Sequence, residues 1–324
     1  MLRGPSQTRR TQLSRALIVV TVVVTITACF PLLSTGQEDQ PPGRIAFVRR
    51  GDIWVWEKGE AARIVEDGAA SDPRWSPTGR FVLFVRSGES YSDLVLYDLD
   101  QATEQQLTFN QPDFQIGSPD YVANTSWVID PDWSTNGLIA FASDATNDNS
   151  VILWLLPSPD LAPEPALSAQ PEDDIEAVSL DAAGTIAAYT VRSRDDEGFS
   201  HSIVAIRNLT DGTTTELVDN PNGAFDPAVA PDGVAIALTV RDERDNTDIW
   251  LSDLKGNVTR ITKDAQATQP AWSPDGKWLA YMRMIDYSFE LWAVPKIDAG
   301  FGESRRLFRF KNLDPTSRIS WTFS

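Results

Sequence analysis

The chain has 324 residues, of which 42% are hydrophobic and 23% are charged, and its formal net charge is −18. A chain of this size and composition can bury a large core, and its acidity disfavours nucleic acid and anionic lipid headgroups as partners. Its single cysteine, Cys29, excludes an internal disulfide, and its single histidine, His201, disfavours chemistry that needs several histidines.

The first 28 residues have the layout of a secretory signal peptide. Four arginines precede an uncharged stretch, residues 16–27, that is rich in Val and Ile and too short to span a bilayer comfortably. The stretch ends in Ile-Thr-Ala-Cys, which resembles the bacterial lipoprotein box, in which the cysteine is lipidated and becomes the new N-terminus. The alternative is a plain signal peptide with an incidental cysteine at position 29.

We therefore expect residues 1–28 to be removed, Cys29 to carry the lipid, and residues 29–43 to form a flexible tether. The tether contains Pro41 and Pro42 together with Ser, Thr and Gly residues, as linkers often do. Removal of the four arginines lowers the formal net charge from −18 to −22. These features predict a membrane-anchored protein that lies outside the cytoplasm.

A tight-turn segment recurs along the rest of the chain. In its clearest copy, Trp272-Ser-Pro-Asp-Gly276, the last four residues suit the four positions of a type I turn, and apolar residues flank them as in a β-hairpin. The position of the tryptophan, called the anchor position here, recurs at steps of 58, 47, 49, 43 and 49 residues. A period of this length is typical of a propeller or a stacked array. The six anchor residues are Trp75, Trp133, Leu180, Val229, Trp272 and Trp321.

Each repeat holds four short apolar runs, which we call strands A to D, with the anchor in strand A. The repeat region begins at Arg44-Ile-Ala-Phe47, a strand B with no strand A before it, and it ends with a strand A, Arg318–Phe323. The two ends therefore complete one blade, which removes the open sheet edges. The pattern predicts an all-β, six-bladed propeller over residues 44–324.

The repeat resembles that of the TolB-type, WD-repeat-like propellers. The resemblance rests on Trp-Ser-Pro-Asp-Gly followed by Leu-Ala-Tyr, Asp-Ile-Trp and Arg-Ile-Thr, and it covers nearly all of residues 44–324. It implies a propeller whose strand A is the innermost strand of each blade. It implies little about function, because propellers host many unrelated functions.

Loop lengths favour one face of the predicted ring as the binding face. In an up-and-down blade, the A–B and C–D turns lie on one face and the B–C and D–A loops on the other. The A–B and C–D turns are short except for the elongated, Pro-rich C–D turn Pro157–Pro165, whereas the B–C and D–A loops are longer, and binding residues concentrate on such loops. An Asp-Pro pair enters strand A on this loop-rich face in four repeats. Its aspartates are Asp72, Asp130, Asp226 and Asp314.

These four aspartates have two interpretations. Each can cap its own turn while the proline begins a strand where no N–H is needed. Alternatively, the four surround the mouth of the central channel and bind a cation or a basic peptide.

The connection Asn110–Ser126 on the same face is the second candidate binding element. It holds Phe114 and Tyr121, and Trp127 lies just beyond it. These aromatic residues form either a recognition surface or a layer packed over the third blade.

The leading functional hypothesis is a non-catalytic, monomeric binding module that recognises a protein or another envelope component. We expect no cofactor, no metal ion and no catalytic residue. The segment Asp242–Asn246 lacks the ligand spacing and the glycine of a calcium loop. The alternative is a propeller enzyme, a carboxylate-based glycosidase or lyase that acts on an extracellular polysaccharide, since acid–base catalysis of that kind needs only two carboxylates.

Overall fold

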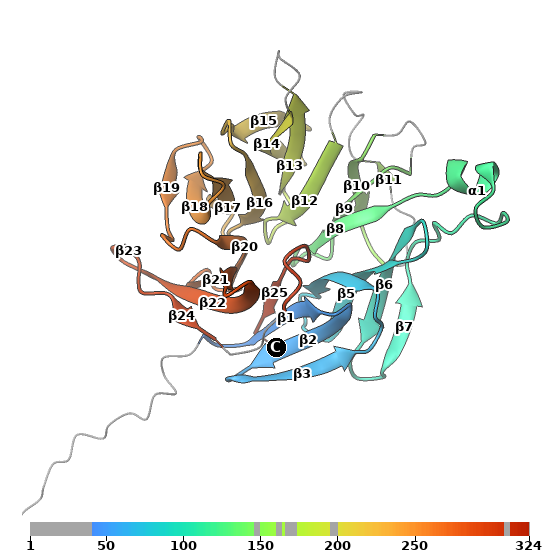
Figure 1. Cartoon of the computed structure of the whole chain (residues 1–324), viewed down its shortest axis with the longest axis horizontal. Helices are drawn as coiled ribbons and strands as arrows, with labels where there is room; N and C mark the ends of the chain where they lie inside the picture. Colours follow the sequence, from blue (N-terminus) through green and yellow to red (C-terminus); the bar gives the residue numbers. More distant parts are fainter. Residues whose placement is uncertain are drawn as a thin grey trace, which may run out of the picture. The chain divides into compact units, whose positions relative to one another are not determined.

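The computed structural model describes residues 41–145, 150–159, 164–165, 174–194, 200–307 and 312–323. Within these ranges the strands form six antiparallel sheets, arranged as blades around a ring (Figure 1). The predicted all-β, six-bladed propeller is therefore confirmed. Residues 1–28, Cys29 and most of the predicted tether lie outside the described residues. No helix in the described ranges is long and apolar enough to cross a membrane.

The six blades follow one another along the chain, and in blades 2 to 5 the strands run in sequence order outward from the centre. In blade 1 the last strand of the chain is the innermost, and in blade 6 both β23 and β24 pair with β22. Blade 1 contains β25 (Ser320–Thr322), β1 (Arg44–Arg49), β2 (Asp52–Glu57) and β3 (Glu60–Val65). Blade 2 contains β4 (Ala70–Trp75), β5 (Phe81–Ser87), β6 (Ser92–Asp98) and β7 (Thr103–Gln106). Blade 3 contains β8 (Val128–Trp133), β9 (Ile139–Ser143), β10 (Ile152–Leu156) and β11 (Glu164–Pro165).

The remaining three blades repeat this order. Blade 4 contains β12 (Asp174–Leu180), β13 (Ile186–Arg194), β14 (Ser200–Asn208) and β15 (Thr214–Val218). Blade 5 contains β16 (Ala224–Val229), β17 (Ala235–Arg241), β18 (Thr247–Asp253) and β19 (Val258–Arg260). Blade 6 contains β20 (Ala267–Trp272), β21 (Trp278–Ile285), β22 (Ser288–Ile297), β23 (Gly300–Phe301) and β24 (Arg305–Arg306).

The C-terminal strand closes the ring as the repeat count predicts. β25 pairs antiparallel with β1, so that Trp321 lies opposite Ile45. Trp321 is only 7% exposed and belongs to a core cluster that joins blade 1 to blade 6. Hydrogen bonds and apolar burial thus tie the two ends of the repeat region together.

The recurring turn has the predicted geometry. In the clearest copy, the N–H of Gly276 donates to the carbonyl of Ser273 at 2.9 Å, and Gly276 has a φ of 66°. Glycine adopts this left-handed conformation without the steric cost that a Cβ brings. The same i to i+3 bond joins Gly79 to Ser76 at 2.9 Å.

One short helix lies in the connection between blades 2 and 3, where the sequence pattern predicts a loop. α1 spans Pro119–Ala123, and the Oγ of Ser118 caps it by accepting from the N–H of Tyr121 at 3.1 Å. A serine followed by a proline at the first helical position is a local helix-start signal, so the helix could have been predicted.

Candidate binding site at the ring centre

The inner strands of all six blades end around a central hollow of about 320 Å³, which we call the central funnel. Its wall is formed by strand A residues at and next to the anchor position, and Figure 1 shows these inner strands converging on the middle of the ring. The six anchor residues, which include four tryptophans, all line it: Trp75, Trp133, Leu180, Val229, Trp272 and Trp321.

The funnel opens among the short A–B turns. Pro77, Pro231 and Pro274, each at the second position of its turn, contribute to its lining. This is the face opposite to the loop-rich face on which the sequence analysis expects binding. Loop length therefore did not indicate where the centre of the ring is hollowed, because the hollow is lined by inner-strand ends rather than by long loops.

The residue before the anchor joins neighbouring blades at the funnel wall. Asp132 Oδ2 accepts from the N–H of Leu180 at 2.7 Å, and Ser179 Oγ accepts from the N–H of Val229 at 3.0 Å. Ser320 Oγ likewise accepts from the N–H of Trp75 at 3.0 Å. Strand A is the innermost strand, so its backbone N–H groups on the central side have no further strand to pair with. Each of these bonds gives one such N–H group an acceptor. These hydrogen bonds tie the inner strands of blades 3 and 4, 4 and 5, and 1 and 2 to each other at the funnel wall.

Two buried arginines, Arg74 and Arg318, contribute to the lining of the funnel. Arg74 Nε lies 3.3 Å from Asp132 Oδ1, and Arg74 Nη1 donates to the carbonyl of its neighbour Pro73 at 2.8 Å. Arg318 reaches across the centre to the carbonyls of Val178 and Pro227 in blades 4 and 5, the latter at 2.7 Å. Burial, together with the positive charge of Arg318, lowers the pKa of Arg74 to about 10.

The position three residues before the anchor forms a second ring, farther from the short A–B turns and nearer to the loop-rich face. Asp72, Asp130 and Asp226 occupy it in blades 2, 3 and 5, with φ values of 49°, 49° and 52°. The strand register shifts at this point, as in a β-bulge. Aspartate tolerates this left-handed conformation better than most residues do. Arg318 occupies the equivalent position in blade 1.

Asp314, the fourth predicted aspartate, does not join this ring. It lies seven residues before its anchor Trp321, whereas the other three lie three residues before theirs. Its N–H donates to the carbonyl of Val48 at 3.0 Å, and its Oδ1 accepts from the N–H of Thr316 at 3.0 Å. The structure thus brings three of the four aspartates together and places Asp314 in a separate turn.

The three aspartates of the ring each accept structural hydrogen bonds. Asp72 Oδ1 accepts from the N–H of Arg318 at 2.9 Å, and Asp130 Oδ2 accepts from the N–H of Ala177 at 2.8 Å. Asp226 Oδ2 accepts from the hydroxyl of Thr268 at 3.0 Å. These three partners lie in blades 1, 4 and 6 rather than in the local turn, so these bonds join blades instead of capping the turn, and the binding of a cation or a basic peptide stays a prediction.

Burial raises the pKa of two of these carboxyl groups. The pKa of Asp72 rises to about 7, chiefly because the side chain is buried and secondly because Asp130 is close. Burial also raises the pKa of Asp226, while the guanidinium of Arg318 opposes this rise. In both side chains burial thus favours the protonated, uncharged carboxyl over the carboxylate.

The acidic groups that line the funnel already have partners. Asp181 Oδ1 accepts from the N–H groups of Thr185 and Ile186 at 2.6 and 2.8 Å, and Asp132 pairs with Arg74 as described above. Within the described ranges, no group of three His, Cys, Asp or Glu side chains is arranged to hold a metal ion. His201 is elsewhere, on β14, where its Nε2 lies 3.1 Å from Asp219 Oδ1.

The aromatic residues of the connection between blades 2 and 3 lie in two environments, one buried and one exposed to solvent. Tyr121 is 1% exposed and packs inward, as the packing interpretation expects. Phe114 and Trp127 are 49% and 40% exposed, as the recognition interpretation expects. Sequence alone could not separate these residues, because it does not indicate which side of a short irregular segment faces the blades.

Comparison with known proteins supports the fold and leaves the function open. No protein-family model and no curated protein matches the chain. The structure is similar to TolB from Acinetobacter baumannii, with a TM-score of 0.66, 16% identity and coverage of 86% of this chain and 66% of that one. The chain thus spans slightly less than two thirds of that TolB.

Two other similar structures come from proteins of different kinds. One is from a nidogen/laminin complex, with a TM-score of 0.59, 11% identity and coverage of 86% of this chain and 97% of that one. The other is an oligogalacturonate lyase in complex with manganese, with a TM-score of 0.53, 15% identity and coverage of 82% and 73%. At these identities the likeness establishes only that the chain is a six-bladed propeller structurally similar to TolB.

Proposed function

We propose that this protein is a non-catalytic binding module, held outside the cytoplasm by a lipid on Cys29, and that it binds a protein or another envelope component at the central funnel. The observation that carries the proposal is the funnel itself, a hollow of about 320 Å³ to which all six blades contribute. Ligand sites are commonly concave, largely pre-formed and lined by apolar groups with a few polar ones.

The chemistry of the funnel favours binding over catalysis. A carboxylate-based glycosidase or lyase needs a pair of carboxyl groups that are free to exchange protons with the substrate. Both aspartates at the funnel, Asp132 and Asp181, are engaged in hydrogen bonds or an ion pair with the protein. Their role in holding the wall supports a rigid binding surface, and rigid surfaces bind with little loss of conformational entropy.

The test uses the tagged protein as bait in its native envelope, followed by affinity measurement with the purified partner. Ala182 lines the funnel, so Ala182→Phe should obstruct it and weaken binding at least about tenfold, the effect of losing roughly 1.4 kcal/mol. Ala299→Phe is the matched control, because Ala299 is exposed between β22 and β23.

A second variant distinguishes the two faces. Replacing Asp72, Asp130 and Asp226 together by Asn changes the ring on the loop-rich side with little change in shape. If the triple variant loses binding while Ala182→Phe binds normally, the ligand approaches from the loop-rich face and the funnel is not the site. Normal binding by both variants would place the site away from the ring centre.

A further inference from the structure

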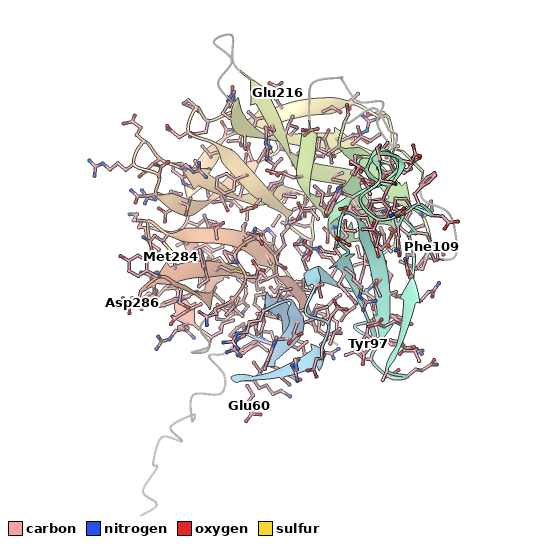
Figure 2. All side chains as sticks on the ribbon, turned by 45° about the vertical axis from the view of Figure 1, so that its right-hand side comes forward. Glu60, Tyr97, Phe109, Glu216, Met284 and Asp286 are labelled. Carbon is pink, nitrogen blue, oxygen red and sulfur yellow. The ribbon has the colours of Figure 1, made fainter. Side chains whose placement is uncertain are left out.

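The connection between blades 2 and 3, residues 107–127, exposes an unusual amount of apolar surface. Among the residues that the structure describes, eleven large hydrophobic side chains are exposed, and five of them lie in this segment. Figure 2 shows one of them, Phe109, at the outer edge of the ring. We call the five the link surface: Phe109 (77% exposed), Phe114 (49%), Ile116 (54%), Val122 (63%) and Trp127 (40%).

The backbone that carries the link surface is firmly held. At its beginning, the N–H of Asn110 donates to Asp93 Oδ1 at 2.8 Å, and Asn110 Nδ2 donates to the carbonyl of Ser92 at 2.8 Å. In its middle, Tyr121 is buried and anchors α1. At its end, the N–H of Trp127 donates to Asp144 Oδ1 at 2.7 Å.

This anchoring distinguishes the segment that carries the link surface from a loop without such bonds. Phe109 and Val122 are chain neighbours of the anchored Asn110 and Tyr121, and the N–H of Trp127 is itself bonded, so these apolar side chains are held in water in the isolated protein. Clustered exposed apolar residues of this kind are typical of interaction sites. A pre-ordered surface also loses little conformational entropy when a partner covers it.

The charge of the segment that carries the link surface indicates which class of partner it attracts. Residues 107–127 contain Asp113 and Asp120, both exposed, and no Lys or Arg. A second copy of the chain would bring a net charge of −18 of its own, and an anionic membrane would likewise be repelled. A partner with basic residues around an apolar centre is attracted instead.

We propose that the link surface docks a partner protein that inserts apolar side chains flanked by Lys or Arg. The surface lies on a D–A connection, on the face opposite to the short turns that surround the central funnel. The proposal is therefore independent of binding at the funnel, and either can fail without the other.

The test places a photo-crosslinking amino acid at Phe114 or Ile116 of the full chain in its native membranes. The matched control is Tyr287, which is 99% exposed at the β21–β22 turn in blade 6, next to Asp286. Figure 2 labels Asp286 at the edge of the ring, on the side opposite to Phe109. Illumination should give a protein adduct from positions 114 and 116 that position 287 does not give. Sequencing of the cross-linked peptide should place Lys or Arg within a few residues of the attachment point.

Charge variants test the electrostatic part of the proposal. With the crosslinker at Ile116, the double change Asp113→Asn and Asp120→Asn should lower the adduct yield about two- to fivefold at low salt, and added salt should reduce this difference. Asp286→Asn, at the control site, should leave the yield unchanged. An adduct with lipid, with a second copy or with an acidic peptide, the same adduct from position 287, or no adduct at all would overturn the proposal.

Discussion

At the scale of single residues, the centre of the ring depends on Arg318. It is 6% exposed, and its guanidinium bonds carbonyl groups in blades 4 and 5 while its N–H bonds Asp72 of blade 2. It is also a positive charge beside Asp226. This one residue thus connects blade 1 to three other blades, two through its side chain and one through its backbone N–H, and its charge offsets part of the acidic ring.

Replacing Arg318 should therefore be costly. Arg318→Leu leaves two buried carbonyls without this donor and removes the cation near Asp226, so we expect a loss of about 3–5 kcal/mol in the free energy of unfolding. Arg244→Leu, an exposed change, should cost less than about 0.5 kcal/mol. Urea unfolding of both variants checks the expectation, which is wrong if the two lose similar stability.

The buried carboxyl of Asp72 predicts that the free energy of unfolding depends on pH. Its carboxyl has a folded pKa of about 7 against an ordinary value of 3.8, so the folded state binds the proton more tightly than the unfolded state. The resulting stabilisation is complete below about pH 4 and is lost as the pH rises to about 7. Between these values, the wild type should lose stability relative to Asp72→Asn, by an amount on the order of 1–4 kcal/mol.

The control for this pH effect is Asp314→Asn, because Asp314 lies outside the ring of aspartates. The measurement is the free energy of unfolding in urea at a series of pH values from 4 to 8. Parallel curves for the wild type and Asp72→Asn would show that Asp72 does not titrate in this range.

At the scale of elements, β25 holds the ring closed. Without it, β1 has an unpaired edge and the core between blades 1 and 6 loses Trp321. Deleting residues 315–324 also removes Arg318 from the centre. The last strand therefore supports both the edge of a sheet and the packing of the inner ring.

We expect this deletion to abolish cooperative unfolding. Removing residues 30–40 of the predicted tether should leave the thermal transition nearly unchanged, which makes it the matched deletion. Circular dichroism melting curves compare the two. Similar curves would contradict the role assigned to β25 in closing the ring.

At the scale of the whole molecule, the predicted lipid on Cys29 decides where the propeller is found. More than one acyl chain holds a protein firmly at a membrane, whereas a single chain binds it only marginally. Cys29→Ser should therefore shift the protein from the membrane fraction to a soluble or an uncleaved form. Fractionation and immunoblotting measure this shift, and a wild-type protein found only in the soluble fraction would refute lipidation.

The sequence by itself determined the architecture of residues 44–324. Each tight turn depends on four consecutive residues, and the number of anchor positions equals the number of blades. The turns and the blade number can therefore be predicted from the sequence alone. The incomplete blade at the beginning, which lacks strand A, and the lone strand A at the end likewise predicted closure by β25. Spacing also contained a signal that Asp314 differs, since it lies seven rather than three residues before its anchor.

Only the tertiary structure decided where the molecule is hollow and which side chains meet there. The central funnel, the reach of Arg318 across the centre and the inward position of Tyr121 all depend on residues from different blades or on the surface that a segment faces. Local turn chemistry and hydrophobic periodicity describe neighbours along the chain. They do not describe contacts between side chains that lie a hundred or more residues apart, such as Arg318 and Val178. Those contacts are set by the closure of the ring, which brings six inner strands to a common centre.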